Sequence, residues 1–161
     1  MKFSAQEEFG LRCLVSLARE GRNGFLTIPQ ISQREALTPS HVAKILSALR
    51  KAGFVRSVRG QAGGYTLARQ PEEIAIRDVL GAMGGRLFDD GFCVRHSGVG
   101  DTCVHTTNCS LRPLWSAVQN AVDRAVSEYS LADLVEGEID APNVVMESRP
   151  PQRLPVLNAS E

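Results

Sequence analysis

The sequence contains no long apolar run and no recognisable export signal. A membrane-spanning helix needs roughly 18 or more consecutive apolar residues, and no run in the chain approaches that length. The segment Met1–Glu8 lacks the apolar stretch of a secretory signal peptide. We therefore expect a cytoplasmic protein with no membrane partner, whose thiols stay reduced and whose fold does not depend on disulfides.

The chain also has no net charge, since 18 Lys and Arg balance 18 Asp and Glu. The two signs are nevertheless separated along the sequence. Residues 34–69 hold seven basic residues and one acid, Glu35, whereas residues 128–161 hold seven acids and only Arg149 and Arg153. A basic segment in a neutral chain predicts a local surface for an anionic partner.

Signs of catalysis are missing as well. Cys103 and His105 are the pair nearest to a nucleophile and its base. No nucleophile-bearing turn, phosphate-binding loop or third orienting group accompanies them. We therefore do not expect an enzyme.

What the sequence does contain is a succession of capped helices. Ser4 and Glu7 have the spacing of a capping box before an apolar helical pattern that ends near Gly21. Thr27 is placed to cap a second, shorter helix, and the pair Thr38-Pro39 to begin a third, which Gly53 ends. This order of helices predicts a helix-turn-helix.

A glycine-rich hairpin follows the third predicted helix. Residues 54–58 and 65–67 read as two short strands, with residues 59–64 at the tip. Three helices followed by a hairpin are typical of a winged helix, in which the third helix enters the major groove and the wing contacts the backbone or minor groove. The predicted DNA-contacting residues are Thr38, Ser40, His41, Lys44, Arg59 and Gly60.

Further helices are predicted beyond the wing, so the fold class is mainly α with a small β wing. One helix carries Ile76, Val79, Leu80 and Met83 and ends at Gly84-Gly85, a long one runs over about residues 110–129, and a short one begins after Ser130. The long helix carries a wide apolar stripe that includes Leu114, Trp115 and Val118, and a second copy of the chain is the expected cover. The predicted units are a winged helix-turn-helix over 1–70, a cysteine loop with a dimerisation helix over 71–136, and a disordered tail over 137–161.

Three cysteines stand in the one stretch without a helix or strand pattern: Cys93, Cys103 and Cys109. An odd number of thiols cannot all pair as disulfides within one chain. Thiolates gathered in a loop suit a soft metal, an iron–sulfur cluster or redox chemistry.

Several of these segments resemble one family of dimeric winged-helix regulators, which includes IscR, NsrR and RirA. The resemblance covers residues 1 to about 135 and is carried by these segments: Met1–Ser4, Leu49–Val55, Ser57–Gly60, Gly63–Tyr65, the cysteines, and Leu114-Trp115. It implies a homodimer that binds double-stranded DNA at a palindromic operator. It also implies that the loop cysteines bind an iron–sulfur cluster, 2Fe–2S or 4Fe–4S, whose state controls DNA affinity.

The sequence departs from this family at two places. Nine residues separate Cys93 from Cys103, a longer gap than is usual in IscR-like sequences. Arg112 also stands where those sequences place a histidine ligand, and a guanidinium stays protonated. The remaining candidates for the fourth ligand are Glu8, His105, His96 and Cys13.

Among these candidates, the resemblance to NsrR-like members favours Glu8, supplied by the partner subunit, with His105 as the alternative. Cys13 is expected to pack as a small apolar residue in the first helix. The expected signal is iron or cluster supply, redox state or nitric oxide. Two other readings stay open: a winged-helix regulator that uses the cysteines as a thiol switch or zinc site, and an adaptor that binds protein rather than DNA.

Overall fold

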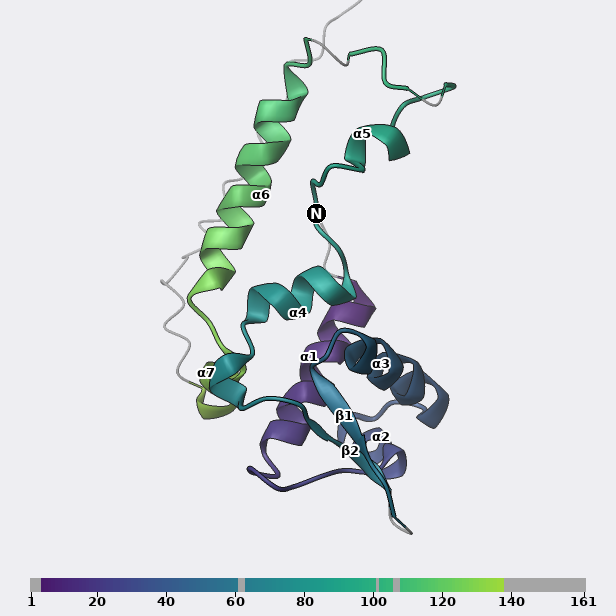
Figure 1. Ribbon diagram of the computed structural model, residues 1–161, viewed down its shortest axis with the longest axis vertical. Helices are drawn as coiled ribbons and strands as arrows, with labels where there is room; N and C mark the ends of the chain where they lie inside the picture. Colours follow the sequence, from purple (N-terminus) through teal and green to yellow (C-terminus); the bar gives the residue numbers. More distant parts are fainter. Residues whose placement is uncertain (1–3, 61–62, 101, 106–107, 138–161) are drawn as a thin grey trace, which may run out of the picture.

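The computed structural model describes residues 4–60, 63–100, 102–105 and 108–137 (Figure 1). The chain is mainly helical, with one two-stranded sheet. The elements, in order, are α1 (Ala5–Ala18), α2 (Ile28–Glu35), α3 (Pro39–Lys51), β1 (Val55–Val58), β2 (Gly64–Leu67), the 3-10 helix η1 (Pro71–Glu73), α4 (Ile76–Met83), α5 (Phe92–Arg95), α6 (Leu111–Ser127) and α7 (Leu131–Glu136).

The predicted helix starts are confirmed. At α1 the Ser4 backbone N–H donates to a Glu7 carboxylate oxygen at 2.6 Å, and the Glu7 N–H donates to the Ser4 hydroxyl at 3.2 Å. Thr27 forms an equivalent box at the start of α2, and the Thr38 hydroxyl caps α3. Each cap satisfies backbone N–H groups that have no partner within the helix, and so fixes where the helix begins.

The wing is an antiparallel pair in which Val55 faces Leu67 and Val58 faces Gly64. Its base is attached to the chain before α2, because Leu26 and Tyr65 exchange backbone hydrogen bonds at 2.9 and 2.8 Å. Gly64 allows this approach: a Cβ there would lie 2.5 Å from the Leu26 carbonyl oxygen. The wing is therefore fixed at its base to the helix-turn-helix.

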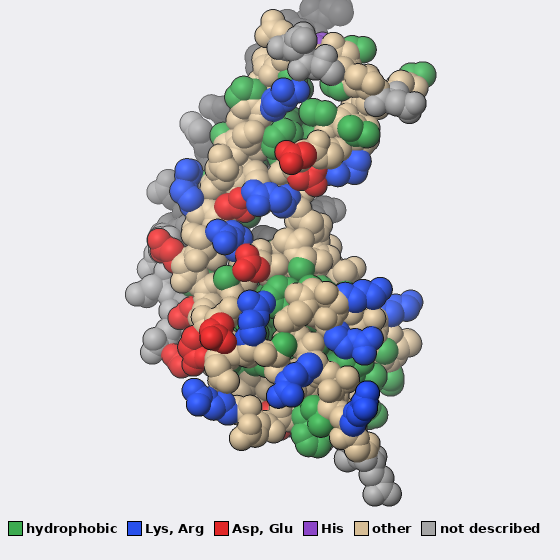
Figure 2. All heavy atoms as spheres, viewed as in Figure 1, with side chains coloured by type: hydrophobic (Ala, Val, Ile, Leu, Met, Phe, Trp, Pro, Cys, Tyr) green, Lys and Arg blue, Asp and Glu red, His purple; other side chains and the backbone are tan. Residues whose placement is uncertain are grey.

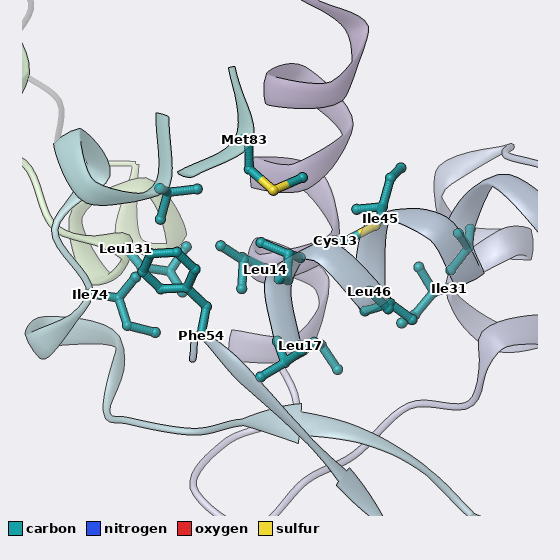
Figure 3. Close-up of a cluster of buried hydrophobic side chains, with 14 of the residues drawn as sticks. Cys13, Leu14, Leu17, Ile31, Ile45, Leu46, Phe54, Ile74, Met83 and Leu131 are labelled. Atoms are coloured by element: carbon teal, nitrogen blue, oxygen red, sulfur yellow. The ribbon is translucent and has the colours of Figure 1, made fainter. Parts of the chain in front are cut away.

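The hydrophobic core surrounds α1 (Figure 3). Leu14 and Leu17 of α1 are fully buried, and α1 contacts α2, α3 and β2. The core also takes residues from beyond the wing: Ile74, Ile76, Val79, Met83 and Leu131. The division at residue 70 stays a prediction, but α4 and α7 share the core of the winged helix.

The remaining elements extend away from this core. In Figure 1, α6 rises from the winged-helix half, and α5 stands beside its upper part. The prediction of a stretch without helix or strand differs from the structure at Cys93, which lies on the four-residue helix α5. The predicted tail, apart from Gly137, lies outside the described residues. Among the helices described here, none is both long enough and apolar enough to span a bilayer.

Candidate DNA interface and cysteine segment

The predicted recognition helix is α3, and its outer face is polar. Ser40 and Lys44 are exposed, whereas Val42, Ile45, Leu46 and Leu49 are buried. Thr38 lies at the N-cap, where its hydroxyl accepts from the His41 N–H at 3.4 Å and lies 3.3 Å from the Ser40 hydroxyl. Short polar side chains at the start of a helix suit major-groove contact.

His41, also predicted to contact DNA, has a second neighbour. Its ring packs edge-on against Phe9 of α1, with 5.2 Å between the ring centroids, and the residue is half-buried. The structure thus places His41 where the recognition helix meets α1.

A polar brace holds the helix-turn-helix together. The Arg12 guanidinium on α1 donates to a Glu35 carboxylate oxygen at 2.8 Å and to the Glu35 carbonyl at 2.6 Å. The Ser16 hydroxyl donates to the other carboxylate oxygen of Glu35. Because Glu35 is the last residue of α2, this brace fixes the end of α2 on α1 just before the turn. In that turn Ala36 adopts φ +54°.

The wing supplies the other predicted contacts. Arg59 and Gly60 are exposed, and Gly60 has φ +141°, a conformation that only glycine adopts readily. Gln61 and Ala62, at the tip, lie outside the described residues. In Figure 2, Lys and Arg side chains gather over the winged-helix half, Asp and Glu gather along its left side, and side chains of both signs lie around α6. Of the seven acids in residues 128–161, only Glu128, Asp133 and Glu136 lie within the described residues.

The cysteine segment, defined here as residues 92–110, joins α5 to α6. Cys93 lies on α5, Cys103 in the connecting stretch, and Cys109 two residues before α6. All three are partly exposed and free. Within the described residues, however, no three or more His, Cys, Asp or Glu side chains are grouped as they would be to hold a metal ion. The described residues of a single chain therefore do not form a closed metal site.

An aromatic cluster, missed by the sequence analysis, borders Cys93. Phe92 lies between Phe88 and His96, at centroid distances of 5.1 and 4.2 Å, and Trp115 of α6 lies 6.3 Å from Phe92. The four-residue spacing of Phe88, Phe92 and His96 was the available signal, since such residues share a helix face. This cluster connects α5 to the first half of α6.

The four candidates for a further ligand occupy different sites. Glu8 is exposed in the first turn of α1, and His105 is exposed in the cysteine segment. The His96 Nδ1 lies 2.8 Å from the Phe92 carbonyl oxygen.

Cys13 is the fourth candidate, and it has no solvent exposure. Burial, with Glu35 nearby, raises the pKa of its thiol to about 12. The interpretation of Cys13 as a core residue is confirmed, because this thiol neither ionises at neutral pH nor reaches the surface.

The apolar stripe of α6 is largely open in one protomer. Leu111 is 55% exposed, Leu114 52% and Trp115 38%. Large apolar side chains exposed together in this way mark an interaction surface.

Comparison with known proteins agrees with this architecture. Residues 3–137 match the family model Rrf2, described as an iron-dependent transcriptional regulator. IscR of Aliivibrio salmonicida is 30% identical over 86% of this chain and 80% of its own length.

Two solved structures are similar. CymR, the global cysteine regulator of B. subtilis, is 27% identical, with a TM-score of 0.66 over 85% of this chain and 98% of its own. IscR of T. potens is 26% identical, with a TM-score of 0.66 over 88% and 91%. With its winged helix and long α6, this chain belongs to the Rrf2 family of transcriptional regulators, which bind DNA and are not enzymes.

Proposed function

We propose that this regulator is a homodimer whose DNA affinity is controlled by an iron–sulfur cluster bound through Cys93, Cys103 and Cys109. The observation that carries the proposal is the set of three free, partly exposed thiols within one segment. Such a set cannot be used up by disulfides inside the chain, and thiolates are the ligands of iron–sulfur clusters.

The donor chemistry fits this group, although the described residues of one protomer do not group into a complete ligand set. Three thiols leave one position of a 2Fe–2S or 4Fe–4S cluster for another ligand. We propose Glu8 of the partner subunit for this position, with His105 as the alternative. The Glu8 carboxylate and the His105 imidazole are both exposed and lie outside the core. When bound, the cluster supplies iron chemistry that responds to redox state, nitric oxide or cluster supply.

The exposed stripe of α6 supports the homodimer. A second copy brings an identical stripe, and pairing the two would cover Leu111, Leu114 and Trp115 by a two-fold contact. Two wings held at a fixed spacing would read a palindromic operator. On each protomer the proposed contacts are Thr38, Ser40, His41, Lys44, Arg59 and Gly60.

One alternative has a specific observation in its favour. Free, partly exposed cysteines also suit a thiol switch, and one similar solved structure is CymR of Staphylococcus aureus in an oxidized form. In that reading, or with zinc, the same three residues would control the same DNA-binding surface without iron.

One experiment separates these readings. The full chain is purified anaerobically, its iron, sulfide and zinc are measured, and DNA binding is compared between loaded and cluster-free protein. We expect bound iron and sulfide, visible absorption, and different DNA affinities for the two forms. Cys13→Ala is the matched control and should keep its iron, whereas Cys103→Ala should lose it. A colourless protein holding zinc, or one without metal whose DNA binding follows thiol oxidation, would support the alternative.

A further inference from the structure

Gln119 is the one buried residue of α6 in a protomer, and its side chain is polar. It is 5% exposed, and a buried amide costs free energy unless its donors and acceptors are hydrogen-bonded. Both ends of this amide are: Oε1 accepts from the Phe88 backbone N–H at 3.1 Å, and Nε2 donates to an Asp123 carboxylate oxygen at 2.8 Å. The amide orientation is thus fixed by two partners.

Asp123 extends the network. Its second carboxylate oxygen accepts from the Arg86 guanidinium. Arg86, Phe88, Gln119 and Asp123 therefore form a polar clamp, the name used for them below. This clamp joins the chain between α4 and α5 to two successive turns of α6.

The clamp lies at the entrance to the cysteine segment. Cys93 lies on α5, five residues after Phe88, while Cys109 lies two residues before the start of α6. The aromatic contact between Phe92 and Trp115 is a second link between the same two parts of the chain. The clamp thereby restricts where the Cys93 end of the segment can lie relative to the Cys109 end.

We propose that Gln119 is a positioning residue for metal binding, which holds the Cys93 end of the cysteine segment against α6 so that the three thiols can meet at one cluster. This rests on the cluster function proposed above. The physical reason is entropic, because thiols on an untethered segment must be ordered when the cluster binds, and ordering costs conformational entropy. The clamp already orders the Cys93 end of the segment before the cluster binds, which reduces this cost.

The test uses the full chain with three variants. Gln119→Leu removes both hydrogen bonds of the amide while keeping a side chain of similar size. Asn120→Leu is the matched control, because Asn120 is an exposed amide on the same helix. The double variant Gln119→Glu/Asp123→Asn is the rescue, since it keeps an acceptor for the Phe88 N–H and a donor–acceptor pair between positions 119 and 123.

Two rates are measured. One is alkylation of Cys93 by iodoacetamide in the cluster-free chain, followed by peptide mass spectrometry. The other is loss of visible absorption from the reconstituted chain after a chelator is added. We expect Gln119→Leu to raise both rates about tenfold, the effect of losing buried hydrogen bonds, and the rescue to return them to within about twofold of the unmodified chain. Asn120→Leu should change neither rate.

Unchanged Cys93 alkylation in Gln119→Leu, an equal rise in Asn120→Leu, or no recovery in the double variant would each overturn the proposal. Should the unmodified chain take up no iron, the cluster function fails, while the alkylation rates still decide on the clamp. Alkylation of Cys13 reports loss of the fold. If Gln119→Leu exposes Cys13, the variant Gln119→Glu is used in its place. The carboxylate at position 119 then repels Asp123, so Cys93 should be alkylated faster in Gln119→Glu than in the double variant. Equal alkylation rates in these two variants would refute the clamp.

Discussion

The cysteines of this chain occupy two environments that give them different chemistry. Cys13 lies in the core, where desolvation disfavours the thiolate. Cys93, Cys103 and Cys109 are partly exposed in a segment that joins two helices. The thiolate is the form that binds metals and attacks oxidants, so the three accessible cysteines are the ones able to act as ligands or switches.

The buried thiol makes a prediction about alkaline pH. In the unfolded chain Cys13 ionises near its ordinary pKa of 9.0, whereas in the fold its pKa is raised to about 12. The neutral thiol's contribution to stability is therefore complete below pH 9 and is lost as pH rises from 9 toward 12, by up to about 1.4 kcal/mol per pH unit. Cys13→Ala should remove this part of the slope. Urea unfolding of both chains across this range measures it, and identical slopes would contradict the burial of the thiol.

The wing arginine makes a prediction about DNA. Arg59→Ala should weaken binding and reduce the slope of log affinity against log salt by about one, the effect of losing one phosphate contact. Titration of operator DNA at several salt concentrations measures both. Arg77→Ala is the control, because Arg77 lies on α4 and is paired with Asp78 at 3.5 Å. An unchanged slope for Arg59→Ala would place the wing away from the phosphates.

At the scale of elements, helix starts and apolar periodicity were readable from the sequence because they depend on neighbouring residues. Ser4 with Glu7 and Thr38 with Pro39 are local signals, and the helices begin where these signals lie. The short helix α5 was missed because its hydrogen bonds depend on the Phe88, Phe92 and His96 stack and on its contact with α6. Gln119 was missed for a similar reason: Phe88, whose N–H donates to its amide oxygen, lies 31 residues away in sequence.

The candidate site was predictable only in its residue types. The three cysteines and the candidates for a fourth, non-thiolate ligand can be read from the sequence. The relative positions of the three thiols cannot, because they depend on a long, glycine-bearing connection between Cys93 and Cys103. The residues that would fix one end of this connection belong to α6 and to the chain before α5. Tertiary contacts of this kind leave no periodic pattern in the sequence.

The apolar face of α6 gives a prediction about assembly. Leu114→Glu should break the proposed dimer, because it places a carboxylate in an apolar contact at a cost of several kcal/mol. Leu114 is a sharper test than Val118, since its side chain is 52% exposed in the protomer and its replacement spares the protomer's own packing. Sedimentation measures the mass, with Asn120→Glu as the exposed control on the same helix. A dimer that survives Leu114→Glu would move the interface elsewhere, and specific operator binding should disappear with the dimer.

At the scale of the whole molecule, α1 packs against both α4 and the recognition helix α3. Gly10 of α1 approaches α4 so closely that a Cβ would lie 2.9 Å from Cε of Met83. Phe9, the residue before it, contacts His41 of α3. A displacement of the first turn of α1 therefore reaches both α4 and the recognition helix, which gives an effector a physical route to the DNA-binding surface.

The proposed ligand Glu8 occupies that first turn, and the last prediction concerns its role. If Glu8 binds the cluster of the partner subunit, then Glu8→Ala should still assemble a cluster on the three thiolates. This cluster should be lost faster and absorb differently, and its presence should no longer change DNA affinity, because the link to α1 is gone. Anaerobic reconstitution, visible spectra and DNA titration measure these effects, with Gln6→Ala as the exposed control on the same turn. Each of the three loop cysteines changed to alanine should instead prevent assembly. If Glu8→Ala leaves the spectrum, cluster lifetime and DNA response unchanged while His105→Ala alters them, the ligand is His105 and the cluster does not bridge the subunits through α1.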